Sequence, residues 1–156
     1  MSTSFDPTFI FYRDDREVLA LETLGDMAAE AEAELAIRIR LYPGMIQKGR
    51  LARVDADREL RVMGAIADDL TGKLARAGAE PRGTATWTER IDCLRREILN
   101  RRANYPRYVE AGHVDQDTAD RRLRVLESIH DMTWHMTWST DAIAAREATE
   151  RRAAAA

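Results

Sequence analysis

The fold is decided by residues 34–70, which read ELAIRIRLYPGMIQKGRLARVDADRELRVMGAIADDL. Residues 97–133 lie 63 positions further along and read EILNRRANYPRYVEAGHVDQDTADRRLRVLESIHDMT, so the two stretches align without a gap. Thirteen of the 37 aligned positions are identical. The chain therefore contains an internal repeat, and we expect both copies to form the same supersecondary unit.

Apolar residues in the first copy recur at steps of three and four, which is typical of amphipathic helices. The first helix is expected to begin at the Asp14 cap and to end or kink near Tyr42, because the residue before Pro43 resists the α conformation. Gly49 is expected to close the elbow that follows in the left-handed conformation. A second helix is expected over residues 53–77.

The second copy predicts a matching pair of helices after a short linker. Thr86 and Glu89 form the sequence pattern of a capping box, from which a helix is expected over residues 87–104. Asp115 is expected to cap a further helix that runs at least to Trp138. Each copy is therefore interpreted as one helical hairpin.

A lone hairpin leaves half of its apolar seam in water, whereas two hairpins together bury the seams of all their helices. We therefore predict an all-α fold in which the duplicated helical hairpin forms a four-helix up-down bundle, with both Tyr-Pro elbows at one end. A homodimer that covers the seams is the alternative. Gly64 stands inside a predicted helix, where it costs about 1 kcal/mol, and it is expected to mark a close crossing.

The length of 156 residues predicts a single domain. Its expected parts are an N-terminal arm (1–13), the first hairpin (14–77), a linker (78–86), the second hairpin (87–138) and a helical or frayed tail (139–156). The single cysteine, Cys93, excludes an internal disulfide and is expected to be a small core residue. No apolar run approaches the roughly 18 residues that span a bilayer, and the N-terminus lacks the layout of a signal peptide, so we expect a cytoplasmic protein.

Acid–arginine pairs spaced four residues apart recur in both copies and predict ion pairs along the helices. These pairs are Glu34–Arg38, Asp57–Arg61, Glu97–Arg101 and Asp120–Arg124. Arg38 falls in register with the apolar seam, so we expect it to bind Glu34 and also Asp57 or Asp68. Arg101 is expected to do the same in its copy, where Asp131 matches Asp68. The alternative is an ordinary solvated face.

The sequence predicts neither catalysis nor a bound cofactor. It contains no G-x-S-x-G, no glycine-rich phosphate loop and no H-E-x-x-H. Asp131 and His135 are the only residues with ligand-like spacing, and surface positions are the more common reading of such a pair. We therefore expect no metal site and no enzyme activity.

The predicted third helix and its elbow are rich in arginine and tyrosine. The residues that carry this pattern are Arg95, Arg96, Arg102, Tyr105, Arg107 and Tyr108. Arginine interleaved with aromatic residues suits phosphate contact and base stacking, so nucleic-acid binding is one interpretation. Residues 1–35 carry a net charge of −7 within a chain of net charge −3, so internal neutralisation of this basic face is the favoured interpretation.

The pattern E-x3-R-x3-Y-P-x5-G, followed by A-D-R-x-L-R-V, resembles short uncharacterised helical proteins of prophages and bacterial mobile elements. The resemblance covers the two copies and implies a protein that binds and blocks, or organises, a larger complex, for example a host defence nuclease. We therefore expect a non-catalytic protein-interaction module. Its partner-binding residues are expected at the elbows and are Lys48, Arg50, Arg107, Tyr108 and His113; the acidic first helix is a second candidate surface.

Overall fold

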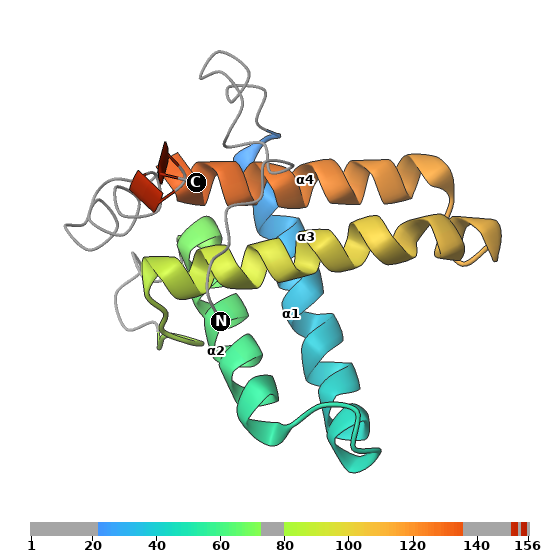
Figure 1. The fold of residues 1–156 in the computed structure, drawn as a ribbon, viewed down its shortest axis with the longest axis horizontal. Coiled ribbons are helices and arrows are strands. Elements are labelled where there is room, and N and C mark those ends of the chain that lie inside the picture. The colour runs from blue at the N-terminus through green and yellow to red at the C-terminus, as the bar shows by residue number, and fades with distance from the viewer. Residues whose placement is uncertain (1–21, 73–79, 136–150, 153, 156) are drawn as a thin grey trace. The chain divides into compact units, whose positions relative to one another are not determined.

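The computed structural model describes residues 22–72, 80–135, 151–152 and 154–155, and it contains helices but no strand in these parts of the chain. The four helices are α1 (Leu24–Gln47), α2 (Arg53–Thr71), α3 (Trp87–Glu110) and α4 (Gln116–His135). Helix α1 packs against α2, and α3 packs against α4, each pair as an antiparallel hairpin (Figure 1). The predicted all-α fold is confirmed, and this pairing is the one that an up-down arrangement of four helices requires.

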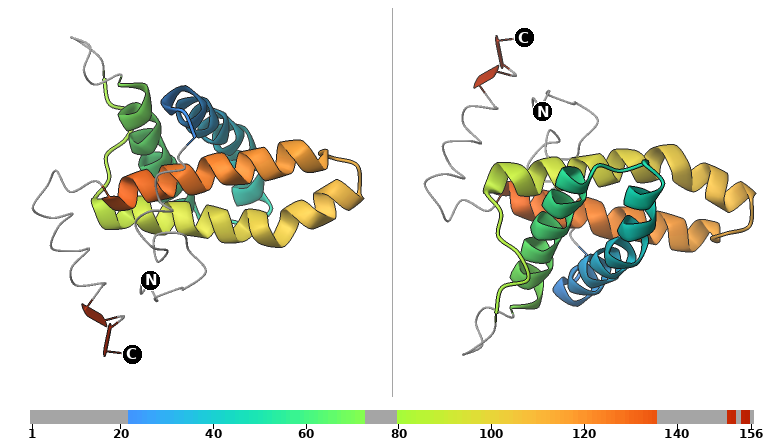
Figure 2. Two further views of the ribbon diagram at one scale, coloured as in Figure 1. Left: turned by 90° about the horizontal axis from the view of Figure 1, so that it is seen from above. Right: turned by 90° about the horizontal axis from the view of Figure 1, so that it is seen from below.

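The chain divides into two compact units, and each contains one hairpin. The first unit spans Thr23–Ala85, and the second contains Glu22 together with residues from Thr86 onward. Figure 2 shows that the two helices of each hairpin stay side by side when the view is turned. The predicted arm and tail, and the helix residues expected before Glu22 and after His135, lie outside the described residues.

The helices of the two hairpins begin in the same register of the repeat. Leu24 and Trp87 start α1 and α3 and are equivalent positions, as are Arg53 and Gln116 at the starts of α2 and α4. The caps are equivalent as well. The hydroxyl oxygen of each N-cap threonine accepts a hydrogen bond from the backbone N–H three residues on, at 3.1 Å in both hairpins (Thr23 from Asp26, Thr86 from Glu89). The structural repeat therefore begins well before the block of identical residues.

The predicted start of the first helix at Asp14 is wrong, because Thr23 has extended backbone angles and caps a helix that begins at Leu24. Leu24 is largely exposed and does not belong to the apolar seam. The other predicted caps are confirmed: Thr86 and Glu89 form a reciprocal capping box, and the Asp115 carboxylate accepts a hydrogen bond from the Thr118 N–H at 2.8 Å. The second helix ends at Thr71, before Gly72 in the left-handed conformation, rather than at residue 77.

The expectation that the first helix ends near Tyr42 is wrong, and so is the predicted end of the third helix at residue 104. Pro43 and Pro106 lie inside α1 and α3, which continue to Gln47 and Glu110. Both prolines are exposed, so the carbonyl that each leaves without its helical N–H donor is accessible to water. The cost of the missing hydrogen bond is therefore small enough for one more helical turn to form.

Each helix then closes with the same turn. Gly49 and Gly112 adopt the left-handed conformation, with φ angles of 69° and 77°, as the sequence predicted for Gly49. The N–H of each glycine donates to the carbonyl three residues earlier at 3.0 Å, and the next N–H donates to the carbonyl five residues earlier at 2.9 Å. This is the pattern of a Schellman motif, which satisfies the last carbonyls of the helix. The two elbows are therefore fixed in the same way.

The predicted apolar seams form the core of each hairpin. The buried seam residues are Ala31, Leu35, Ala56, Met63, Ile66 and Leu70 in the first hairpin, and Ile91, Leu94, Ile98, Leu126 and Ile129 in the second. Trp87 lies at the start of α3, and its ring centroid is 5.1 Å from that of Trp134 on α4. Its indole N–H donates to the Thr133 carbonyl at 2.8 Å, so the open end of the second hairpin is closed by aromatic packing. Cys93 is fully buried on α3, as expected.

Candidate interaction sites in the two hairpins

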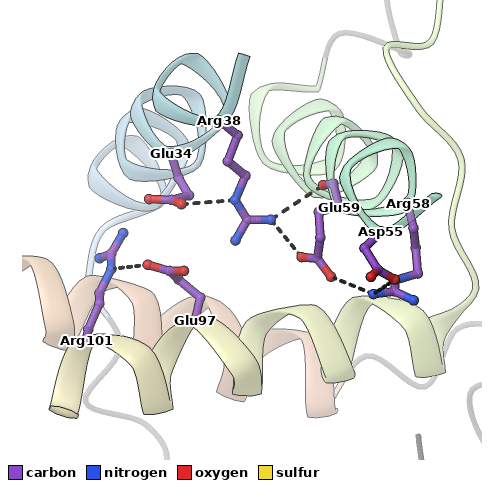
Figure 3. A network of polar contacts seen from close by, with 7 residues as sticks. All are labelled: Glu34, Arg38, Asp55, Arg58, Glu59, Glu97 and Arg101. Carbon is purple, nitrogen blue, oxygen red and sulfur yellow. Dashed lines mark hydrogen bonds and ion pairs between the residues drawn. The ribbon is translucent and has the colours of Figure 1, made fainter. Parts of the chain in front are cut away.

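Arg38 is a buried arginine that joins the two helices of the first hairpin. Its Nε donates to Glu34 Oε1 at 3.0 Å on the same helix. Its Nη1 donates across to α2, to Glu59 Oε2 at 3.0 Å and to the Glu59 carbonyl at 3.4 Å. Figure 3 shows the guanidinium between these two carboxylates, and Glu59 continues the network to Arg58 and Asp55. A buried guanidinium needs such charged acceptors, because desolvation is costly without them.

Arg101 repeats this arrangement in the second hairpin. Its Nε donates to Glu97 Oε1 at 3.1 Å, and its Nη1 donates to the Arg122 carbonyl at 3.0 Å. Arg122 occupies the position of Glu59, so the backbone acceptor is conserved between the copies while the side chain differs. The guanidinium also lies 5.6 Å from the ring centroid of Tyr105. Arg38 and Arg101 therefore have the same place and the same orientation in their hairpins.

The structure brings the pairs Glu34–Arg38 and Glu97–Arg101 together, as their spacing predicts. The carboxylate that Arg38 meets on α2 is Glu59, which the sequence analysis did not name. Glu59 was hard to identify from the sequence, because the register of an antiparallel hairpin depends on how many residues its elbow contains. With α1 predicted to end too early, the facing position on α2 could not be identified.

The other predicted ion-pair residues have different neighbours. Arg61 donates to the Thr84 carbonyl at 2.7 Å, and its expected partner Asp57 is exposed. Asp120 accepts from Gln116 at 2.8 Å, while Arg124 lies 3.4 Å from Glu22. Asp131 lies 3.3 Å from Nδ1 of the fully buried His130. Asp68 binds Arg82, which the sequence analysis had placed in a linker.

Residues 80–85, the described part of that predicted linker, are fastened to the first hairpin by Arg82. Its Nη1 and Nη2 donate to the two carboxylate oxygens of Glu32 on α1 at 2.6 Å each. Its Nε donates to Asp68 Oδ1 on α2 at 2.6 Å, and its backbone N–H donates to Asp68 Oδ2 at 2.7 Å. We call residues 81–84 the strap, because they tie the open end of this hairpin together.

Two glycines allow the strap to lie this close. A Cβ built on Gly64 would stand 2.8 Å from the Arg82 carbonyl oxygen, so this helical glycine does mark a close crossing, as predicted. A Cβ built on Gly83 would overlap the carbonyl oxygen of Arg61. Both neighbours are backbone atoms, which cannot rotate away as a flexible side chain could. The backbone of the strap therefore packs directly against the backbone of α2.

The strap arginine remains a cation under all ordinary conditions. Its hydrogen bond to Glu32 raises the pKa of Arg82 above the usual value, desolvation opposes this rise, and the bond to Asp68 adds to it. Asp68 is buried, so its charge depends on the guanidinium for compensation.

Basic residues surround the elbow of the first hairpin. Lys48 and Arg50 are exposed there, together with Arg40 and Arg53, and none of the four side chains has an ion pair with another residue in the described segments. The sequence has no acid between Glu34 and Asp55. Aliphatic side chains lie in the same segment in solvent: Ile39, Leu41 and Val54 are 58%, 48% and 73% exposed. We call residues 39–54 the basic elbow.

The elbow of the second hairpin has a different surface. Arg107, Tyr108 and His113 are all exposed, and Arg107 donates to the amide oxygen of Asn104. The Tyr108 ring centroid is 6.4 Å from that of Tyr105. Each predicted partner-binding residue is therefore at an exposed elbow, and the expectation that the two elbows share one end stays a prediction.

The predicted nucleic-acid face of α3 is partly used inside its own hairpin. Arg95 is buried, donates to His130 Nε2 at 3.3 Å and lies 5.4 Å from the ring centroid of Trp134. Arg102 pairs with Glu127 on α4 at 3.0 Å, and Arg96 is half-buried. Arg107 is the predicted arginine that remains exposed. Arg95 is therefore removed from the set of residues that could contact a phosphate backbone.

The described residues contain no cluster of three or more histidine, cysteine or carboxylate side chains placed to hold a metal ion. Within those residues, no helix combines the length and the apolar character that crossing a membrane requires.

Comparison of the chain with protein-family models, with curated proteins and with solved structures found no match.

Proposed function

We propose that this protein is a non-catalytic helical module that binds another protein through the elbows of its hairpins. The proposal is carried by the basic elbow, residues 39–54, where exposed aliphatic side chains accompany cations that have no ion pair within the described segments. Mixed cationic and apolar surface suits an interface in which a few buried anchors are framed by charges. The proposed contacts are Lys48 and Arg50 in the first hairpin, and Arg107, Tyr108 and His113 in the second.

The elbow geometry supports this proposal energetically. Both turns are held by Schellman hydrogen bonds, and each joins two helices that are packed along their length. A surface that is already ordered loses little conformational entropy on binding, so more of its contact energy remains as affinity. The elbow motif that resembles mobile-element proteins extends the proposal to a large partner, for example a host defence nuclease complex that the module would block or organise.

Nucleic-acid binding is the competing function, and it has less support. Phosphate recognition requires several arginines free to reach the backbone of the ligand. On α3, Arg95 is buried and Arg102 pairs with Glu127, whereas the aliphatic side chains of the basic elbow favour a protein surface. The two functions differ in how capture responds to nuclease.

Affinity capture from the source cell tests the proposal. The tagged chain should retain the same protein partner after nuclease treatment. The double variants Lys48→Glu/Arg50→Glu and Arg107→Glu/Tyr108→Ala should each reduce capture at least tenfold while the far-UV circular dichroism spectrum stays unchanged. Arg121→Glu is the matched control, because Arg121 is an exposed arginine on α4 away from the elbow turns, and it should leave capture intact.

Two results would contradict this function. Equal capture by the elbow variants and the unmodified chain would remove the elbows as the interface. Loss of the partner on nuclease treatment, combined with a steep fall of DNA or RNA affinity with salt, would establish the nucleic-acid alternative instead.

A further inference from the structure

The strap fills a defined site on the first hairpin, which we call the arginine slot. Its walls are the carboxylates of Glu32 on α1 and Asp68 on α2, and its floor is Gly64. All four carboxylate oxygens accept a hydrogen bond from Arg82, three from the guanidinium and one from the backbone N–H. The slot therefore binds both the side chain and the backbone N–H of the same residue.

The contacts select arginine over lysine. A planar guanidinium can place Nε on one carboxylate and its two terminal nitrogens on another, as Arg82 does at 2.6 Å for each of these bonds. A lysine ammonium is a single point of charge and cannot make this fork. The neighbouring residue is selected too, because a side chain on Gly83 would overlap the Arg61 carbonyl, and Arg61 in turn donates to the Thr84 carbonyl at 2.7 Å.

The second hairpin shows that the slot is not required for this fold. At the position of Glu32 it has Arg95, and at the position of Gly64 it has Glu127, so one acidic wall and the open floor are missing, while Asp131 stands at the position of Asp68. Both residues are engaged inside that hairpin, Arg95 with His130 and Glu127 with Arg102. The slot is therefore a feature of one copy only, added to a hairpin that forms without it in the other.

We propose that the arginine slot is a recognition site for an extended Arg-Gly segment of a partner protein, and that the strap occupies it as an internal competitor. Arg82 and Glu32 keep partly exposed side chains, at 27% and 36%, so a second segment can approach the ion pair from solvent. The Asp68 side chain is almost completely covered, so any occupant of the slot has to bring a cation to this carboxylate. This inference uses no elbow residue, so it stands or falls independently of the proposed function.

Titration of a peptide into the full chain tests this proposal. The probe is the amidated, acetylated peptide EPRGTA, which copies residues 80–85. The variant Arg82→Lys weakens the internal competitor but keeps its charge, and it should bind EPRGTA at least tenfold more tightly than the unmodified chain does. The peptides EPKGTA and EPRATA should bind this variant at least tenfold more weakly, because one loses the fork and the other meets the Arg61 carbonyl.

A second variant identifies the place of binding. Adding Glu32→Arg to Arg82→Lys installs the residue that the second hairpin has at this position, and it should abolish EPRGTA binding. Amide signals of residues near Gly64 should shift with the peptide in the single variant and stay fixed in the double variant. Equal binding of EPRGTA and EPKGTA, or no binding of EPRGTA to folded Arg82→Lys protein, would overturn the proposal.

If Arg82→Lys does not fold, chemical rescue of Arg82→Ala tests whether the slot recognises a guanidinium. Ethylguanidinium should restore the helical circular dichroism signal of Arg82→Ala at millimolar concentration, and ethylammonium should not. Equal rescue by both cations would overturn the proposal, because it would mean that the site responds to positive charge without recognising the guanidinium.

Discussion

The first and second hairpins have matching helix starts, matching elbow turns and equivalent buried arginines, and they differ in the residues that stand at and beside the positions of Glu32 and Asp68. In the first hairpin, Glu32 and Asp68 receive Arg82 from the strap, a segment outside the helices. In the second, Arg95 stands where Glu32 would be, and Asp131 lies beside His130. Equivalent positions of the two hairpins therefore carry different polar contacts, which come from the strap in the first hairpin and from residues of α3 and α4 in the second.

A second difference explains how the strap finds room. The second hairpin links α3 and α4 by the ion pair Arg102–Glu127 at 3.0 Å. The equivalent residues in the first hairpin are Ile39 and Gly64, which cannot form this ion pair. Ile39 is exposed, and Gly64 has no side chain, so the surface of α2 is lower at that point. The strap passes over that lowered surface, which indicates that the two substitutions belong together.

Removal of the buried arginines should have the largest effect and should differ between the hairpins. Arg38→Ala removes the Arg38 guanidinium from both Glu34 and Glu59, and loss of one partner of a buried ion pair costs roughly 3–5 kcal/mol. Arg101→Ala should cost less, because Arg122 stands at the position of Glu59 and the contact at that position is to its backbone carbonyl rather than to a carboxylate. Urea unfolding followed by circular dichroism measures both free energies, and equal losses would refute the asymmetry.

Alanine at two helical glycines of the first hairpin, Gly64 and Gly44, should change stability in opposite directions. Gly64→Ala should destabilise by about 1–3 kcal/mol, because the new methyl group meets the strap backbone. Gly44→Ala should stabilise by up to about 1 kcal/mol, because nothing lies within 4 Å of its Cβ position and alanine is the better helix former. The midpoints of thermal unfolding compare the two variants directly. Stabilisation by both substitutions would show that the strap backbone moves away from the new methyl group without cost.

The helix cap of α4 in the second hairpin can be introduced at the equivalent position of the first hairpin. Ala52 precedes α2 with extended backbone angles and no side-chain cap, whereas the equivalent Asp115 caps α4. Ala52→Asp should therefore stabilise the chain by roughly 1 kcal/mol. Ala52→Leu is the control, since leucine has no acceptor, and an equal midpoint of thermal unfolding for both variants would contradict a capping effect.

The smallest effect should be the pH dependence of the native cap. The Thr118 backbone N–H and its hydroxyl both donate to Asp115, and they lower the pKa of that carboxyl below its ordinary value. A lowered folded pKa contributes stability above the unfolded pKa of about 3.9, and this contribution is lost as the pH falls through the folded pKa. Carboxyl-carbon NMR titration should show this, and Thr118→Val should move the Asp115 pKa back upward.

The periodic apolar residues were sufficient to predict the helices and most of their buried faces. The capping residues Thr86 and Asp115 were also predictable, because a cap is a local interaction over three residues. Local rules failed at Pro43, where exposure to water made one lost hydrogen bond tolerable. They failed as well at the start of α1, where Thr23 provides a cap within a longer helix-like pattern.

The interaction sites were less predictable than the fold. The exposed positions of Lys48 and Arg50 follow from the elbow turn, which the sequence placed correctly. Arg82 was read as part of a linker, because its contacts are with residues on two different helices and no spacing rule connects them. Gly64 was the one local signal of the strap, since a glycine inside a helix predicts that another segment passes close by.

The complete burial of Cys93 on α3 makes the second hairpin measurable by itself. A thiol-specific alkylating reagent reaches this sulfur only when α3 separates from its surroundings. Because the chain has a single cysteine, the labelling rate reports the opening equilibrium of one repeat and is blind to the other. The opening of this one repeat can therefore be timed separately from that of the other copy, without isotopes and without an engineered probe.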